Sequence, residues 1–563
     1  MSLLAPTFDE IASLSGVPGV SVGILHHGDV VFRYNYGYRD KELREPTTTR
    51  TIYPIASLSK AITALVYGSL VSDGILDWHS PIRNILPEFR STAQEVEQLA
   101  SAADLLSHRT GIPGGETLYF HAQPLLNDSS IIPMFSVLHR RQQFRAEMQY
   151  NNLGYAIAAM AMSEQTGLSY EELLHQKLLR PLKLTRTGLT FHSYDTEDVA
   201  KTYMVTPDGL AVENRRPMFE PGSYMAAVGG IQSSVDDLLV LYREVLREAL
   251  QPSVPSANTT ARTPIREVRK VLSGHVPLGG KRTGILERTY GLGWIRTQLP
   301  GELGAMGLNS WLVERMPVAG QDAHSRLAIY HQGNLPGATS AVYLFPESQS
   351  GIVVLANAYG LSDVPDWISQ AIMDVLFHHS VPVDYIQLTR EAIIKYCAKT
   401  QHDLVLLQGR KPNQASFDVG SFVGDYRNDA DIFIMRVSRH GDDSLRLAFQ
   451  GLQEETFFLY PSHDECYTWF SSFFDMARKG RHIFSASHYI VCFRRNSLGK
   501  VMALEWAHNS SDVAGELFFK MEDNGAPRLA YTVFPLIALI LIFTCLMRGL
   551  RRGLRRGLIF LLY

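Results

Sequence analysis

The sequence predicts an α+β fold, with an antiparallel sheet flanked by helices and a smaller all-β domain after it. Apolar and polar residues alternate over residues 20–38 and again within 326–356, which is the period of β-strands. Between these segments the apolar residues recur at steps of three and four, which indicates helices. Short alternating runs then fill residues 417–521. Strands that enclose a helical segment favour a sheet in which late strands return beside early ones.

The chain is too long for one hydrophobic core. It has 563 residues, whereas single cores stop growing beyond about 250 to 300 residues. We therefore expect a first domain over residues 1–390 and a small β-barrel or sandwich over residues 415–522. The 53 basic and 56 acidic residues give a formal net charge of -3, without a basic stripe before the extreme C-terminus. This balance argues against nucleic acid as a partner.

The elements of the first domain follow from local patterns. A hairpin is expected over residues 20–38, with His27-Gly28-Asp29 at its turn, and we expect His26 and His27 to be ordinary surface residues. A buried helix begins near Ser57, and its repeating positions are Ala61, Ile62, Leu65, Val66, Ser69 and Leu70, with Gly74 as its stop. Further helices are expected over 155–165, 169–179 and 235–250, further strands over 326–331, 341–345 and 351–356, and a surface insertion over 248–290.

The cysteines show no motif, and the N-terminal residues predict an intracellular protein. The four cysteines are Cys397, Cys466, Cys492 and Cys545, and none belongs to a CxxC pair. We therefore expect free buried thiols, without a disulfide scaffold or a zinc site. Residues 1–19 contain Asp9 and Glu10 but no continuous apolar run, so no secretory signal is predicted. We expect a cytoplasmic protein.

The C-terminal segment leaves its interpretation open. Residues 529–547 form 19 residues without a charge, close to the roughly 20 that span a bilayer. Five arginines follow within residues 548–563. A tail anchor would draw these arginines across the membrane, against the positive-inside tendency. The alternatives are membrane association through 529–547, a tail that lies at the interface, and an inaccurate terminal exon.

One pair of residues near the start of the buried helix could carry chemistry. Ser57 and Lys60 are three positions apart, so they lie on one helix face a turn apart. A hydroxyl is a weak nucleophile until a neighbouring group takes its proton, and a partly desolvated lysine can do so. The helix start also offers free N–H groups to an oxygen that becomes negative. Serine and lysine are common, so this pair alone is weak support.

Two further segments make the pair specific, namely Tyr150-Asn151-Asn152 and His331-Gln332-Gly333. Together the three segments give the order SxxK, YxN and then KTG or HxG, here as HxG. In this the sequence resembles the class C branch of the serine β-lactamase and penicillin-binding protein superfamily, with its esterase, D-aminopeptidase and acyltransferase relatives. Flanking matches are DLLSHRTGIP at 104–113, YNNLGY at 150–155, PLKLTRTG at 181–188, GGIQSSVDDL at 229–238 and YGLGW at 290–294. The resemblance spans about residues 10 to 385.

The resemblance implies a fold and a site. It implies a β-lactamase/transpeptidase-like domain, and the run FVGDY at 422–426 resembles the opening of a lipocalin-like C-terminal domain. By resemblance Ser57 is acylated, Lys60 and Tyr150 shuttle its proton, and Asn152 hydrogen-bonds Lys60 and the substrate. His331 takes the third-motif position, and Gly333 and Asn334 border the substrate. The backbone N–H groups of Ser57 and Asn334 form the oxyanion hole. Neither a metal nor a cofactor is implied.

His331 is the departure that bears on the substrate. The lysine of KTG carries a fixed charge suited to a carboxylate, whereas a histidine is often neutral near pH 7. We therefore predict an esterase- or amidase-type serine hydrolase for a small acyl substrate, with an acyltransferase of secondary metabolism and a non-catalytic binding protein as alternatives. We expect Gln332 to narrow the cleft and His108 to hold a loop by hydrogen bonds. The sequence leaves the oligomeric state open.

Overall fold

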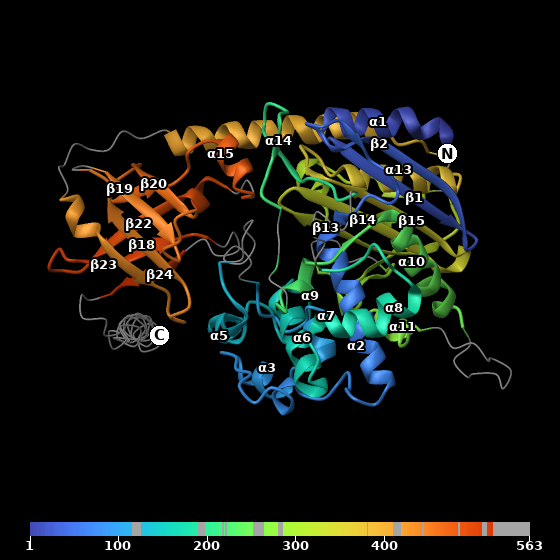
Figure 1. The fold of residues 1–563 in the computed structure, drawn as a ribbon, viewed down its shortest axis with the longest axis horizontal. Helices are drawn as coiled ribbons and strands as arrows, with labels where there is room; N and C mark the ends of the chain where they lie inside the picture. Colours follow the sequence, from blue (N-terminus) through green and yellow to red (C-terminus); the bar gives the residue numbers. More distant parts are fainter. Residues whose placement is uncertain are drawn as a thin grey trace, which may run out of the picture. The chain divides into compact units, whose positions relative to one another are not determined.

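The computed structural model describes most of the chain (Figure 1). The described residues are 1–114, 125–189, 198–216, 219, 222–251, 264–279, 285–321, 323–379, 381–408, 418–441, 444–481, 485–508 and 515–521. Residues Met1–Phe519 form one compact unit. The apolar segment 529–547 and the arginines after it lie outside the described residues. Within the described part, no helix is both long enough and apolar enough to cross a membrane.

The first domain is built on an antiparallel sheet of nine strands in the order β3-β2-β1-β15-β14-β13-β10-β9-β8. Their bounds are β1 Gly19–His26, β2 Asp29–Asp40, β3 Glu45–Pro46, β8 Val276–Pro277, β9 Arg288–Tyr290, β10 Ile295–Leu299, β13 Arg326–Leu335, β14 Ala338–Phe345 and β15 Ser350–Ala356. The early strand β1 pairs with the late strand β15, with Val20 opposite Ala356. The predicted return of late strands beside early ones is confirmed.

The central strands are buried on both faces. Every residue of β14 and β15 is buried. Because side chains alternate along a strand, Val342 and Leu344 join one core cluster, while Ala341 and Tyr343 join another. Helix α10 packs on the first face and α13 on the second. Figure 1 shows the sheet between two helical layers, with α1, α13 and α14 on one side and α2 and α10 on the other.

The helices and short strands complete this domain. The helices are α1 Ala5–Leu14, α2 Ser59–Ser72, α3 Gln94–Leu99, α4 Ala102–Leu106, α5 Ile131–Val137, α6 Leu153–Thr166, α7 Tyr170–Leu174, α8 Arg180–Leu182, α9 Ala226–Gly229, α10 Val235–Ala249, α11 Val268–Leu272, α12 Asn309–Leu312, α13 Val364–Leu376 and α14 Tyr385–Gln408. The short strands are β4 Tyr53–Pro54, β5 Tyr203–Val205, β6 Ala211–Glu213, β7 Gln232–Ser233, β11 Gly301–Glu302, β12 Val318–Ala319 and β16 Ala358–Tyr359. The helix expected over 169–179 divides into α7 and a π-helical turn, His175–Leu179.

The C-terminal domain is a closed barrel of eight strands, β17 to β24. The bounds are β17 Gly424–Arg427, β18 Ile434–Arg439, β19 Leu445–Phe449, β20 Thr456–Pro461, β21 Cys466–Thr468, β22 Ile490–Arg495, β23 Val501–Trp506 and β24 Glu516–Lys520, with helix α15 at Phe473–Arg478. Its core is rich in aromatic rings, such as Phe449, Trp469 and Trp506. The predicted all-β domain is confirmed as a barrel. Helix α14 runs through residue 390, the expected domain end.

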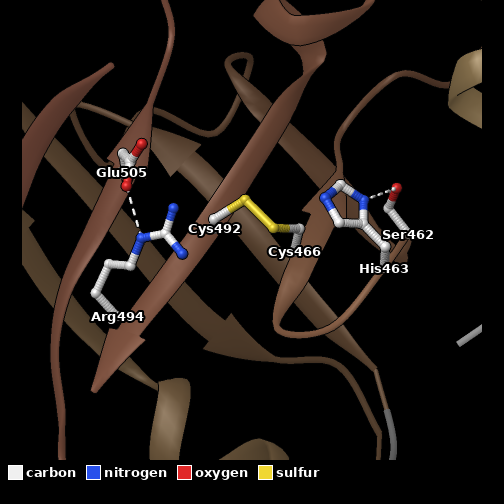
Figure 2. Close-up of a disulfide and its surroundings, with 6 residues drawn as sticks. All are labelled: Ser462, His463, Cys466, Cys492, Arg494 and Glu505. Atoms are coloured by element: carbon white, nitrogen blue, oxygen red, sulfur yellow. Dashed lines mark hydrogen bonds and ion pairs between the residues drawn. A yellow bond between two sulfur atoms is a disulfide. The ribbon is translucent and has the colours of Figure 1, made fainter. Parts of the chain in front are cut away.

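Two of the cysteines form a disulfide, contrary to our expectation of free thiols. Cys466 on β21 lies directly opposite Cys492 on β22, and their sulfurs are bonded (Figure 2). The two cysteines are 26 residues apart in the sequence. Their pairing has no sequence motif, because it depends on which strands become neighbours. His463 lies beside the pair, and its ring nitrogen and the two sulfurs are within 4.8 Å of one another. Cys397 is free and half-buried, and Cys545 lies outside the described residues.

Candidate active site

Ser57 lies in a tight turn that two neighbouring segments hold in place. The turn is the 3-10 helix Ala56–Leu58, directly before α2. Ala56 has a φ of 51°, a left-handed conformation that non-glycine residues rarely adopt. The preceding residue, Ile55, is fixed on both sides: its N–H donates to the carbonyl of Ile231 at 3.0 Å, and its carbonyl accepts from Ser340 Oγ at 2.8 Å. Such strain persists only where the surrounding structure fixes it, and it is common at functional sites.

The Ser57 hydroxyl has two hydrogen-bond partners of the kind that nucleophile activation requires. Lys60 Nζ lies 3.1 Å from Ser57 Oγ, and Tyr150 OH lies 3.0 Å from the same atom. Lys60 also donates to the carbonyl of Val228 at 2.8 Å and is fully buried. Its ammonium lies 5.1 Å from the centre of the Tyr150 ring and 5.6 Å from that of Tyr155. The lysine is therefore desolvated beside the serine and the tyrosine.

A buried histidine and two tyrosines pack around this group. The His108 ring lies 4.2 Å from Tyr150, 5.3 Å from Tyr155 and 5.0 Å from Tyr290, measured between ring centres. Burial, together with the nearby Lys60 charge, lowers the pKa of His108 well below its usual value. Its Nδ1 accepts the backbone N–H of Asn151 at 3.1 Å. The prediction that His108 holds a loop by hydrogen bonding is confirmed.

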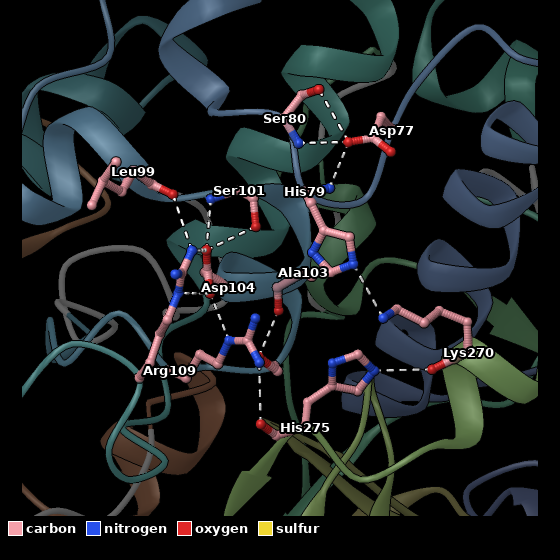
Figure 3. Close-up of polar contacts among 12 residues, drawn as sticks. Asp77, His79, Ser80, Leu99, Ser101, Ala103, Asp104, Arg109, Lys270 and His275 are labelled. Carbon is pink, nitrogen blue, oxygen red and sulfur yellow. Dashed lines mark hydrogen bonds and ion pairs between the residues drawn. The ribbon is translucent and has the colours of Figure 1, made fainter.

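The loop that carries His108 is fixed by a buried carboxylate (Figure 3). Asp104 accepts from Arg109 Nε at 2.6 Å and from two nitrogens of Arg145 at 2.8 Å. Burial opposes ionisation of Asp104, but the two guanidinium groups outweigh it and hold its pKa below the usual value. Arg109 also donates to the carbonyl of His275 at 3.2 Å. The backbone N–H of Gln149 donates to the His108 carbonyl at 2.7 Å. Tyr150 therefore directly follows a residue whose backbone is held by this loop.

His331 is neutral and hydrogen-bonded to Tyr290. Its Nδ1 lies 2.5 Å from the carbonyl of Gln332, which can only accept, so Nδ1 carries the proton. The Nε2 atom therefore accepts from Tyr290 OH at 3.1 Å. Burial and the positive charge of Lys60 lower the pKa of His331 to about 3. At neutral pH His331 thus adds no positive charge to the site.

Gly333 lets strand β13 approach the serine turn closely. A β-carbon at residue 333 would lie 2.4 Å from Ser340 Oγ and 2.6 Å from the Ile55 carbonyl oxygen. A similar approach is made by Gly293, where a β-carbon would lie 2.6 Å from the backbone nitrogen of Ala61. Asn334, the next residue on β13, donates from Nδ2 to the carbonyl of Met306 at 3.2 Å. These contacts fix the strand against the start of α2.

Gln332 does not narrow the cleft, contrary to our expectation. Its buried amide Nε2 donates to Tyr343 OH at 2.8 Å and to Asp366 Oδ1 at 3.0 Å. Tyr343 belongs to the core on the α13 face of the sheet. Because neighbouring side chains along a strand point to opposite faces, Gln332 points away from the side on which His331 meets Tyr290.

The structure brings the predicted residues together to different degrees. Ser57, Lys60 and Tyr150 are directly hydrogen-bonded, and Asn152 lies at the start of α6, largely buried. His331 joins this group through the rings of Tyr290 and His108. Sequence reasoning missed the contribution of Tyr290, although the run YGLGW was among the matching segments. It also missed the Val228 carbonyl, because a backbone acceptor has no sequence signal.

An antiparallel sheet between helical layers, with a serine at a helix start bonded to a lysine and a tyrosine, defines the class of serine β-lactamases and penicillin-binding proteins. The Beta-lactamase family profile matches residues 6–372, and the chain belongs to this family. It is 24% identical over 348 residues to Protein flp of Staphylococcus aureus, covering 61% of this chain and 60% of that protein. The chain thus spans less than two thirds of that relative.

Two further comparisons give a related sequence and a similar fold. A Beta-lactamase of Pseudomonas fluorescens is 24% identical over 367 residues, which cover 62% of this chain and 91% of that protein. The octameric penicillin-binding protein homologue from Pyrococcus abyssi has a similar fold, with a TM-score of 0.54 and 20% sequence identity. That match covers 92% of this chain and 99% of the other, so the fold likeness extends beyond the family match.

Proposed function

We propose that the protein is a serine hydrolase that cleaves esters or amides of small acyl groups through an acyl-enzyme on Ser57. The observation that carries the proposal is the pair of contacts at Ser57 Oγ, from Lys60 Nζ at 3.1 Å and from Tyr150 OH at 3.0 Å. These two groups can take the proton of the hydroxyl as it attacks a carbonyl. Membership of the Beta-lactamase family supports this chemistry.

The proposed reaction has two steps. Ser57 Oγ bonds to the acyl carbon, and its proton passes through the Lys60 and Tyr150 pair to the alcohol or amine that leaves. The carbonyl oxygen, negative in the tetrahedral intermediate, is stabilised by the backbone N–H groups of Ser57 and Asn334. Water then attacks the acyl carbon, its proton passes through the same pair to Ser57 Oγ as the bond between that oxygen and the acyl carbon breaks, and the free acid leaves. Asn152 positions Lys60 and the substrate.

The neutral His331 favours substrates that place no carboxylate beside its ring. A buried imidazole with a pKa of about 3 offers no cation to a carboxylate. In addition, its Nε2 is engaged by Tyr290. We therefore place neutral acyl esters and amides ahead of β-lactams, whose carboxylate needs a fixed positive charge.

Active-site labelling tests the proposal. A fluorophosphonate probe should label the wild type and leave Ser57→Ala unlabelled, because the probe reacts only with an activated hydroxyl. Ser59→Ala is the matched control, since Ser59 lies two residues further on and accepts the N–H of Ile231 at 3.2 Å. Equal labelling of the wild type and Ser57→Ala would overturn the proposal. Hydrolysis of p-nitrophenyl esters with added alcohols then separates free acid from acyl-alcohol, the product that an acyltransferase would form.

A further inference from the structure

Behind strand β13 lies a buried polar cluster that the proposed reaction does not use. We define the rear cluster as Asn309, Gln332, Tyr343, Asp363 and Asp366, all buried. We propose that the rear cluster positions the part of β13 that carries Gly333 and Asn334, and that Gln332 is the positioning residue that connects the two. This inference rests on the proposed function and adds a residue that acts through others on the oxyanion side of the site.

Asp366 is the centre of the rear cluster. Its Oδ1 accepts from Tyr343 OH at 2.5 Å and from Gln332 Nε2 at 3.0 Å. Its Oδ2 accepts from the side-chain amides of Asn309 and Gln370, each at 3.1 Å. Four donors on four elements, β13, β14, α12 and α13, therefore converge on one carboxylate. Such a network fixes every group that takes part in it.

Asp363 holds the neighbouring loop against the start of α13. Its side chain caps the helix by accepting the N–H of Asp366 at 3.3 Å, and it accepts the N–H of Leu308 at 3.0 Å. A β-carbon at Gly304 would lie 2.8 Å from Asp366 Oδ2, and one at Gly307 would lie 2.9 Å from Asp363 Oδ2. The backbone of residues 304–307 therefore lies directly on the two carboxylates.

The same loop contacts strand β13 at a second point. The carbonyl of Met306 accepts Asn334 Nδ2 at 3.2 Å, while Gln332, two residues earlier, bonds Asp366. The contacts thus form a closed circuit from Gln332 through Asp366 and the loop to Asn334. A circuit that begins and ends on one strand fixes the position of the segment between its ends. That segment is Gly333, which lies against the serine turn.

The burial of two carboxyl groups in the rear cluster is energetically unfavourable, which supports a positioning role. Two carboxylates without exposed surface lie close enough for burial and their mutual repulsion to raise the pKa of Asp363 to about 8. Burial also raises the pKa of Asp366. Apolar residues of similar volume are often as stabilising as buried charges. Stability alone is thus a poor explanation for polar groups at this place.

The test compares two glutamine variants that each remove one donor from the same carboxylate. Gln332→Leu breaks the link to β13, whereas Gln370→Leu removes a donor on α13 that does not connect to the strand. We expect Gln332→Leu to slow acylation of Ser57 by a p-nitrophenyl ester about ten- to a hundred-fold, the range for a small misplacement of reacting groups. Gln370→Leu should stay within about three-fold of the wild type, a change too small for displaced reacting groups. Equal effects of the two variants would overturn the inference.

A conservative variant gives a second measurement that a merely structural role would not change. In Gln332→Glu the side chain donates to Asp366 only when it is protonated, and it repels Asp366 when it is ionised. Acylation should therefore recover toward the wild-type rate as the pH falls, with an additional titration absent from the wild type. A pH profile parallel to that of the wild type would contradict the positioning role.

Failure of the proposed function is distinguishable from failure of this inference. If Ser57 is not labelled in the wild type, the hydrolase proposal fails, and hydrogen exchange then decides the inference. Gln332→Leu should speed amide exchange in residues 304–309 and 329–335, while strand β1 exchanges as in the wild type. Unchanged exchange in both segments would overturn the inference whatever the activity. Circular dichroism confirms that each variant is folded.

Discussion

Replacing Gly333 with alanine places one extra carbon between strand β13 and the serine turn. That carbon would lie 2.6 Å from the Ile55 carbonyl oxygen and 3.0 Å from the β-carbon of Ala56. A contact with backbone cannot be relieved by a rotamer change, so the strand or the turn must move by about 0.8 Å before the separation reaches 3.4 Å, where ordinary van der Waals contact begins. Ser340 would also lose its present position, 2.4 Å from the new carbon, and with it the bond to Ile55.

Two measurable effects follow for Gly333→Ala. Overpacking of this kind costs about 1 to 3 kcal/mol of unfolding free energy. A shift approaching 1 Å at the serine should slow acylation about a hundred-fold. Urea unfolding measures the first effect, and the burst of p-nitrophenol from an activated ester measures the second.

The matched control is Gly351→Ala in the neighbouring part of the sheet. Its new β-carbon would meet only side-chain ends, the nearest being Leu344 Cδ2 at 3.2 Å. Such atoms can move by a few tenths of an ångström without moving the backbone. We expect near-normal acylation in this variant. A normal burst rate in Gly333→Ala would refute the argument that the glycine sets the strand-to-turn distance.

Three further predictions concern other parts of the chain. Lys60→Met should lower the acylation rate about a hundred- to ten-thousand-fold, the usual contribution of a positioned base, and full turnover would exclude the proposed proton path. Cys466→Ser should lower the unfolding free energy by about 3 kcal/mol, with labelling of Ser57 unchanged, and reduced wild type should match it in urea unfolding. Asp363 holds its proton in the folded state up to a pKa of about 8, above the unfolded value near 3.8. Its contribution to the free energy of unfolding is therefore complete below pH 3.8 and is lost as the pH rises from there through 8. This decline is about 1.4 kcal/mol per pH unit at most. Asp363→Asn should remove it, as measured by urea unfolding at pH 6 and 9.

Much of the fold follows from local patterns in the sequence. The hairpin of β1 and β2 was predicted because alternation and a His-Gly-Asp turn are local signals, and the turn joins His26 to Asp29 as expected. Helices α6 and α10 begin and end within two residues of the predicted ranges. The disulfide was not predictable in this way, because it depends on the pairing of β21 with β22. Local periodicity does not choose strand neighbours.

In the candidate site, too, local motifs were predictable from the sequence and long-range contacts were not. The ordered motifs predicted that Ser57, Lys60 and Tyr150 belong to one site, and in the structure Lys60 and Tyr150 both hydrogen-bond to Ser57. The prediction that the Gln332 side chain narrows the cleft was wrong, because the motif defines a position along a strand but not the face to which the side chain points. Tyr290 was missed as a partner of His331, since 41 residues separate them. Such partners become visible only when strands β9 and β13 take their places in the sheet.

The serine turn depends on parts of the chain that are synthesised at very different times. Ser340 bonds Ile55 across 285 residues, and Val228 accepts from Lys60 across 168 residues. Because contacts of such separation form slowly, the turn that holds Ser57, the proposed nucleophile, should be completed late in folding, once β13 to β15 have joined β1. A growing chain that has not yet produced residues 326–356 therefore carries an inert Ser57. Labelling of this serine during refolding would report directly on the final closure of the sheet.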